Sequence, residues 1–355
     1  MKLTLRLERR LTPSRALGFL IPVFSIVLAL CFGAVLLAAV GKNPGVVYQK
    51  MFSGAFGSKF GLTETVVKAI PLMLSGLGVA VAFRMLLWNI GAEGQLQIGA
   101  FAAAGVALAF PQAPAAVIIP AMMLAGFLGG ALWASIPATL KAKLQVNEII
   151  TSLMLNYVAI YWVEYLVYGP WKNPKGYGFP GTAPFSPAAE LPRLGASRVH
   201  LGLLFGLVAA LCLYFILRRT KWGYEIRVIG ENPTAARYAG ISLTRNILTV
   251  MALSGGLAGL AGMSEVSGII HALQRGISPG YGYTAIIVAW LAKLNPWAIV
   301  VVSFLFAGLL VGGDQLQISM GLPAAMSNIL QGAVLFFILG GEILVRHRIS
   351  LTWEK

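Results

Sequence analysis

The stretch 88-WNIGAEGQLQIGAF-101 lies between two apolar runs that each look able to cross a membrane. It carries a carboxylate and side-chain amides, at Asn89, Glu93, Gln95 and Gln97, and three glycines. In hydrocarbon, irregular backbone leaves N–H and C=O groups that need partners, so a break of this kind has to lie against protein or line a water-filled path. The stretch is therefore either the lining of a pathway or a short loop between two spans.

The composition of the whole chain fits lipid better than water. The 355 residues are 58% hydrophobic and 11% charged, whereas a soluble protein has about 25% charged residues. A net charge of +15 would suggest nucleic acid in a soluble protein, but here the basic residues cluster between apolar runs and no aromatic and basic face accompanies them. They indicate cytoplasmic loops beside anionic membrane lipid, and no nucleic acid partner is expected.

About ten apolar segments are predicted to be membrane-spanning helices, because a span needs about 20 mostly apolar residues. The first of them follows a basic N-terminus but is too long for a secretory signal, so it is interpreted as an uncleaved span. With the N-terminus inside, the inner loops hold about twice as many Lys and Arg as the outer ones, which favours both termini in the cytoplasm. The predicted segments are 16–40, 66–83, 90–110, 115–139, 149–169, 200–217, 247–268, 281–294, 297–317 and 323–345.

The chain contains an internal repeat. The segment 116-AVIIPAMMLAGFLGG-130 aligns with 298-AIVVVSFLFAGLLVG-312, and "LSG" recurs at 74–76 and 253–255 with nearly the same offset. Both longer segments contain the small-residue motif that lets helix backbones approach closely, so the two halves are expected to pack through it. The glycines of this motif are Gly126, Gly130, Gly308 and Gly312.

The repeat predicts two five-helix halves, 16–169 and 200–345, within a single transmembrane domain that covers 1–355. Because each half has an odd number of spans, the second copy has to be inverted in the membrane, as in many transporters. The halves are joined by the outer loop 170–199, which is rich in Pro and Gly and is either a connector or a docking surface.

The same offset aligns the opening stretch with a second polar break, 268-GIIHALQRGISPGY-281. Interrupted segments at corresponding places in two halves indicate a substrate path between them. Polar residues inside a membrane bundle are functional by default, although each of them can also serve as a hydrogen bond between helices. The candidate pathway residues are Trp88, Asn89, Glu93, Gln95, Asn156, Gln274, Tyr281, Gln315 and Asn328.

The inner segment 218–246 contains a pattern typical of a short capped helix. Asn232 suits the N-cap, Pro233 the first helical position and Gly240 the C-terminal cap. The pattern predicts a helix from Pro233 to Ala239. A helix of this length is marginal in water, so either the membrane domain or a partner protein has to hold it.

Four motifs together resemble the permease subunits of bacterial ABC importers, the binding-protein-dependent inner-membrane components, in the branch that serves nucleosides and simple sugars. They are "NIGAEGQ" at 89–95, "NEIITSLMLNY" at 147–157, "GENPTAARYAGI" at 230–241 and "LSGGLAGLAG" at 253–262. The resemblance runs from about Val66 to Leu344. It implies a multi-pass protein of the bacterial inner membrane.

The resemblance also implies partners. Within 218–246, the "GENPTAARYAGI" segment corresponds to the coupling helix that sits in a groove of the ATP-hydrolysing subunit. A second, homologous permease chain, giving a heterodimer, and an external substrate-binding lipoprotein are implied as well. The residues that would couple to the ATPase are Glu231, Asn232, Pro233, Ala236, Arg237, Tyr238 and Gly240.

The sequence lacks the pattern G-x-x-x-x-G-K-[ST], so the chain is not expected to bind nucleotide by that means. ATP and Mg²⁺ are expected on the partner ATPase, and no cofactor, metal or catalytic residue on this chain. The predicted function is that of a permease subunit for a neutral polar solute, and a nucleoside is the first candidate. The alternatives are a simple-sugar importer and an ion-coupled secondary transporter that uses Glu93, Glu148 or Asp314. A membrane enzyme is disfavoured, because the histidines are scattered.

Overall fold

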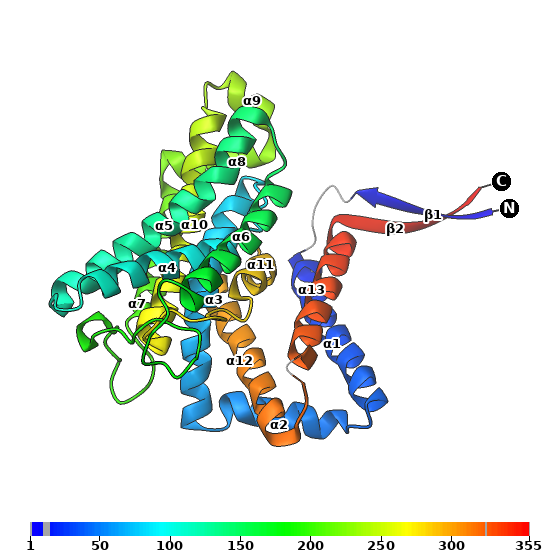
Figure 1. The fold of residues 1–355 in the computed structure, drawn as a ribbon. Coiled ribbons are helices and arrows are strands. Elements are labelled where there is room, and N and C mark those ends of the chain that lie inside the picture. Colours follow the sequence, from blue (N-terminus) through cyan, green and yellow to red (C-terminus); the bar gives the residue numbers. More distant parts are fainter. Residues whose placement is uncertain (1, 10–14, 324, 355) are drawn as a thin grey trace. The chain divides into compact units, whose positions relative to one another are not determined.

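A computed structural model describes residues 2–9, 15–323 and 325–354 of the chain, and nearly all of it is helical. Figure 1 shows the helices as a set of long rods joined by short connections and one long loop before α7. The helices and strands are β1 (Lys2–Arg9), α1 (Arg15–Ala39), α2 (Pro44–Phe56), α3 (Lys59–Arg84), α4 (Ala92–Ala109), α5 (Ala115–Leu144), α6 (Glu148–Tyr168), η1 (Pro187–Ala189), α7 (Gly202–Arg219), α8 (Lys221–Glu231), α9 (Pro233–Tyr238), α10 (Leu243–Glu265), η2 (Val266–Ile270), α11 (Tyr281–Leu291), α12 (Pro296–Met320), α13 (Ala325–Arg346) and β2 (His347–Glu354).

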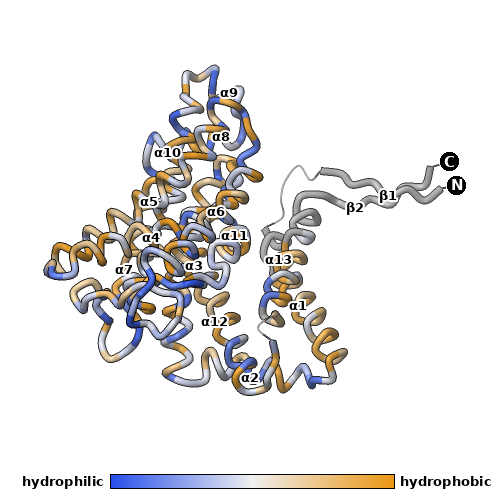
Figure 2. Tube along the Cα trace, in the orientation of Figure 1, coloured by the Kyte–Doolittle hydropathy of each residue, from blue (hydrophilic) through white to orange (hydrophobic). Residues whose placement is uncertain are grey.

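Each of the ten predicted segments overlaps one helix, with ends that differ by at most seven residues, the largest difference being at the start of α3. Among the described residues, six helices are long and apolar enough to cross a membrane, or seven if the bent pair Val23–Ala39 and Pro44–Phe56 counts as one span. Apolar residues run along α5 and α1 in Figure 2, whereas polar residues gather around α9. The helix α11 is only 11 residues long, and α4 carries an acid and two amides in its first half. These two helices therefore differ from ordinary spans.

Close contacts divide the chain into two compact units, residues 62–308 and residues 1–61 with 309–355. Their boundaries fall inside α3 and α12, so they do not coincide with the two predicted halves. In the first unit, α4, α5 and α10 pack against one another. In the second unit, α1 packs against α13.

Glycine allows the tight packing of α4, α5 and α10. A Cβ atom on Gly99 of α4 would overlap the backbone of Gly259 on α10. A Cβ atom on Gly130 of α5 would overlap the carbonyl oxygen of Gly255, also on α10. Because only a residue without a side chain fits, these helices approach backbone to backbone. The predicted role of Gly126 and Gly130 in packing the two halves is thus confirmed, with α10 as their partner.

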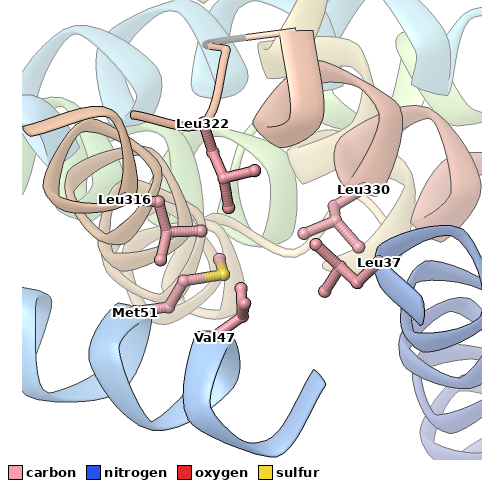
Figure 3. Close-up of a cluster of buried hydrophobic side chains, with 6 residues drawn as sticks. All are labelled: Leu37, Val47, Met51, Leu316, Leu322 and Leu330. Atoms are coloured by element: carbon pink, nitrogen blue, oxygen red, sulfur yellow. The ribbon is translucent and has the colours of Figure 1, made fainter. Parts of the chain in front are cut away.

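The second unit has its own apolar core, drawn in Figure 3. The buried members of this core are Leu37, Val47, Met51, Leu316, Leu322 and Leu330. Gly312 of α12 lies against α2, where a Cβ atom would come within 2.8 Å of the Met51 carbonyl oxygen. Gly312, in the second predicted half, therefore contacts α2, which lies in the first.

Two elements outside the predicted segments were missed. The helix α2 begins at an Asn43 N-cap, whose side chain accepts hydrogen bonds from the Gly45 and Val46 amides, with Pro44 at the first position. The helix α8 is amphipathic and begins at Thr220, whose hydroxyl accepts from the Gly223 amide. Both carry readable capping signals, but neither is apolar enough to be recognised as a span.

The two ends of the chain are the exception to the predicted all-helical fold. The strand β1 pairs with β2 in an antiparallel ribbon, with Lys2 opposite Glu354 and Arg9 opposite His347. Alternating apolar and polar residues in "KLTLRLER" are typical of a strand with two different faces. The basic termini, interpreted from the sequence only as cytoplasmic tails, thus form a β-ribbon.

Candidate functional site

The opening stretch forms the start of α4, at a break after α3. The backbone turns through Leu86, which has a positive φ of 54°, and α4 begins at Ala92. Asn89, Glu93 and Gln95 are all at most 2% exposed. This burial agrees with the prediction from the sequence that these side chains face the protein rather than lipid.

Asn89 and Gln95 form a closed amide pair. The Asn89 Nδ2 donates to Gln95 Oε1 at 2.9 Å and to the Ser254 hydroxyl of α10 at 2.9 Å. In return, Gln95 Nε2 donates to Asn89 Oδ1 at 2.8 Å, and this oxygen also accepts from the Gly91 amide. Every polar atom of the Asn89 side chain is thus used to hold the break and to join it to α10.

Asn156, at the middle of α6, holds the same break from the other side. Its Oδ1 accepts from the Gly94 amide at 2.8 Å, and its Nδ2 donates to the Ile90 carbonyl at 2.9 Å. The Nδ2 also lies 3.3 Å from the Tyr283 hydroxyl of α11. Asn156 is fully buried, so it satisfies backbone groups that irregular structure would otherwise leave unpaired.

Glu93 joins the starts of two short helices. Its Oε2 accepts from the Gly282 amide, in the first turn of α11, at 2.8 Å. A Cβ atom on Gly282 would overlap the Glu93 backbone, so the first turns of α4 and α11 are in direct contact. Ser278 and Gln97 also interact with the carboxylate through their side chains. Both helix N-termini carry partial positive charge, which an adjacent carboxylate stabilises.

The second predicted break, 268–281, forms a π-helical turn and a loop. After Glu265 the helix widens over Val266–Ile270, and the chain reverses at His271, which has a positive φ. The Ser278 hydroxyl then accepts from the Gly280 and Tyr281 amides and caps α11. Tyr281 is buried, as expected of a residue facing the interior.

The remaining candidate pathway residues lie elsewhere. Trp88 is 36% exposed and packs against Phe83 and Trp290, with ring centroids 5.0 and 5.7 Å away. Gln274 is exposed within the second break, where it pairs with Gly181 of the loop 170–199 in an isolated bridge. Gln315 and Asn328 belong to the other compact unit.

Three members of the site are not among the candidate pathway residues predicted from the sequence. Ser254, Gly282 and Tyr283 all lie in the second half of the chain and bond to residues of the first. Ser254 falls inside the "LSGGLAGLAG" motif, which indicated its importance but not its partner. The other two follow directly after the second break.

The long outer loop packs onto that second break. The Leu191 amide donates to the Ser267 carbonyl at 3.0 Å, and the Ser267 hydroxyl donates to the Ala189 carbonyl at 2.6 Å. Further along, the Phe185 amide donates to the His271 carbonyl at 2.8 Å. The loop 170–199 is therefore a structural cover for the break, in addition to a connector.

His200 closes this cover and lies two residues before α7 begins, outside the membrane helices. It is fully buried, and its ring fills the space that a side chain on Gly268 would need. The Nδ1 accepts from the Gly202 amide at 3.2 Å, whereas the Nε2 has no hydrogen-bond partner in the described part of the chain. Burial lowers the pKa of His200 from 6.5 to about 4, and the nearby His271 adds to this shift.

This pKa predicts loss of stability in acid. The unfolded chain gains a proton near pH 6.5 and the folded chain only near pH 4, so stability falls as the pH drops between these values. The shift corresponds to about 3 kcal/mol in total. In detergent, the melting temperature should therefore drop less steeply between pH 7 and pH 4.5 in His200→Gln than in the wild type. A control, His271→Gln, should keep the steep drop, and an equal drop in all three proteins would contradict the assignment.

The inner segment contains the predicted short helix. The Asn232 side chain accepts from the Thr234 and Ala235 amides at 3.0 Å, Pro233 occupies the first position and Gly240 has a φ of +75°. Ala236 is fully buried, whereas Tyr238 is 90% exposed and Arg237 is exposed too. The helix α9 is thus anchored on one face and open on the other.

A cavity of about 270 Å³ lies between α9 and the ends of α5, α6 and α10. Pro233 and Arg237 line it from α9, and Lys141 and Glu148 form an ion pair of 2.9 Å on its other wall. Glu148 begins α6, the helix that carries Asn156. The cavity beside α9 thus reaches the helix that holds the buried break.

Comparison with known proteins gives consistent matches. A family model described as branched-chain amino acid transport system, permease component, matches residues 61–339. The glucose ABC transporter permease protein TsgB13 of Haloferax volcanii is 38% identical, covering 100% of this chain and 96% of that protein. The guanosine ABC transporter permease protein NupP of Bacillus subtilis is 35% identical, covering 90% and 92%. The nucleoside ABC transporter permease protein NupB of Lactococcus lactis is 30% identical, covering 90% of each chain.

Proposed function

The chain belongs to the permease family of ABC importers, and from this premise we propose that it forms the membrane path for a nucleoside. As a family member it is a multi-pass protein of the inner membrane and a transport component rather than an enzyme. NupP and NupB support a nucleoside as solute, whereas TsgB13 makes a simple sugar the second candidate.

The observation that carries this proposal is the buried polar cluster where α4, α6 and α11 meet. Asn89, Gln95 and Asn156 hold the break with their amides, Tyr283 adds a hydroxyl, and the single carboxylate of Glu93 is bonded to backbone. No Lys or Arg belongs to this cluster. A break held in this way, with no cation beside it, suits a path for a neutral solute, and the engaged carboxylate disfavours an ion-coupled secondary transporter.

We also propose the inverted arrangement, with about ten membrane-embedded helices in two halves and both termini in the cytoplasm. The contact between the N-termini of α4 and α11 supports it, because these helices follow the two breaks that the repeat aligns. Two helices that enter from opposite faces and meet inside the protein are a known way to build a transport site. The short length of α11 suits an embedded helix better than a full span.

The proposed partners are an ATPase subunit, which would hold ATP and Mg²⁺, a second homologous permease and an external substrate-binding lipoprotein. The exposed face of α9, with Arg237 and Tyr238, is the proposed contact for the ATPase. Glu231, Asn232, Pro233 and Gly240 would shape this contact, while the buried Ala236 would transmit its movement to the bundle.

The test is nucleoside uptake by vesicles that contain the whole complex. Uptake should require ATP and should persist when Na⁺ and H⁺ gradients are dissipated. In Arg237→Glu, uptake should fall several-fold while ATP hydrolysis continues, because the reversed charge weakens the contact but leaves the membrane fold intact. Lys221→Glu, an exposed cation on the same inner segment but outside α9, serves as control and should behave as wild type. Normal uptake by Arg237→Glu would disprove the coupling role, and dependence on an ion gradient would disprove the ATP-driven function.

A further inference from the structure

The exposed faces of the membrane helices differ in chemistry. The outward positions of α5 are aliphatic, namely Leu124, Leu128, Leu132 and Ile136. Those of α7 are likewise apolar, namely Leu204, Val208, Leu211 and Phe215. The helix α6 exposes aliphatic residues in its first half and Trp162 in its second, but it also exposes four tyrosines, namely Tyr157, Tyr161, Tyr165 and Tyr168, which are 48 to 65% exposed. Their spacing of four, four and three residues places them in one row.

Lipid does not account for the whole of this row. Tyrosine is enriched at the two membrane interfaces, where its hydroxyl reaches water. Tyr165 and Tyr168 lie at the end of α6 and fit that position. Tyr157, however, lies at the middle of the helix, about 16 Å along the axis from Tyr168 at 1.5 Å per residue. Its hydroxyl, and that of Tyr161 one turn further, would need partners in hydrocarbon.

Near both ends of the row, α6 bonds to the second break or to the residues that follow it. At the inner end, the Tyr283 hydroxyl lies 3.3 Å from Asn156 Nδ2, next to Tyr157 in the sequence. Tyr283 is 37% exposed, so this end of the row opens on the buried polar cluster. At the outer end, the Arg275 Nε bonds to Glu164 Oε1 at 2.8 Å, and Arg275 also bonds to the Tyr168 side chain. The row thus connects a charged group on the outer side with the amide cluster inside.

We infer that the tyrosine row on α6 is the surface along which a nucleobase stacks on its way from the outer mouth to the Asn156–Tyr283 pair. This inference rests on the proposed function and names the part of the solute that is recognised. Stacking of a base on an aromatic ring tolerates any base, because every base has a π face, whereas hydroxyls add hydrogen bonds to its edges. Successive tyrosines lie about 6 Å apart along the helix axis. The planar base of the solute can therefore contact one tyrosine before it leaves the previous one.

Substitutions that separate ring from hydroxyl test the row. In vesicles with the whole complex, Tyr157→Leu and Tyr161→Leu should each raise the KM for guanosine uptake at least fivefold, which equals the lower bound of about 1 kcal/mol for stacking. Tyr157→Phe and Tyr161→Phe keep the ring and should stay within about twofold. Phe215→Leu removes an equally exposed ring from α7 and should change nothing. Equal effects of the Leu and Phe substitutions, or no effect of either, would overturn the stacking role.

A second measurement tests water access to the row separately from the solute that is carried. In the same complex, Tyr157→Cys and Tyr161→Cys should react with a water-soluble maleimide, and added guanosine should slow the reaction. Leu128→Cys on α5 should react only with a lipid-confined reagent. If the α6 cysteines also react only from lipid, the row does not line a wet path and the inference fails. If they react from water and a sugar protects them while guanosine does not, the stacking inference fails, and the proposed nucleoside with it, while the wet path stands.

Discussion

Gly130→Leu is expected to abolish assembly of the folded protein. A Cβ atom at this position would already overlap the carbonyl oxygen of Gly255, and the rest of a leucine side chain has nowhere to turn because Gly259 follows. Overpacking of a core typically costs about 1–3 kcal/mol, and here the obstacle is backbone rather than a movable side chain. Separation of α5 from α10 would also displace Ser254, and with it the bond to Asn89.

The measurement is the amount of monodisperse protein extracted from membranes. Gly130→Leu should give almost none, and Gly312→Leu should give less than wild type, because Gly312 lies against the α2 backbone at Met51. Gly332→Leu is the matched control, since Gly332 on α13 is exposed and nothing lies within 4 Å of its Cβ position. Wild-type yields from both Gly130→Leu and Gly312→Leu would refute the backbone contacts.

Glu93→Ala is expected to reduce transport by between about fivefold and a hundredfold. The carboxylate holds the first turns of α4 and α11 together through the Gly282 amide, and its loss leaves a buried donor unsatisfied. An unsatisfied buried group costs about 1–3 kcal/mol, which is up to about a hundredfold in an equilibrium. Glu93→Gln keeps the shape and an acceptor oxygen, so it should lower transport only in part.

The graded series separates two roles of Glu93. If the carboxylate orders the break, the rank order is wild type, then Gln, then Ala, and uptake does not depend on ion gradients. If the carboxylate carries a proton or Na⁺, Glu93→Gln is nearly inactive and uptake follows the gradient. Cysteines at 89, 93 and 95 locate the break directly, because reaction from lipid but not from water would place it outside the pathway.

The helices were predictable because their signal is local. Ten apolar segments and the Asn232–Pro233 cap each follow from the residues within them, and each coincides with a helix. The sequence could not reveal that the first turns of α4 and α11 meet, because apolar content alone does not show how helices pack. It also missed the helix α2, whose mixed composition hides it among loops, and the strand pairing of the two termini, which are far apart in the sequence.

The sequence predicted which residues of the site are buried, but it did not predict which residues they bond to. Burial of Asn89, Glu93 and Gln95 followed from the high cost of polar groups in lipid. The identity of Ser254, Gly282 and Tyr283 as their partners depends on how distant helices pack, which one sequence does not determine. Gln315 and Asn328 were included because they are polar in an apolar setting, and this criterion cannot distinguish different regions of the fold.

The bond between Glu93 and Gly282 also has a consequence in time. The two residues are 189 positions apart. Because a ribosome adds about 5–20 residues each second, Gly282 is synthesised about 10–40 s after Glu93. During that interval a carboxylate at the start of α4 has no partner from the second half. Release of the first half into lipid helix by helix would leave this carboxylate in hydrocarbon, at a cost of about 2.5–3.5 kcal/mol. We therefore expect the third predicted span to stay within the insertion machinery, or at the membrane surface, until α11 has been made.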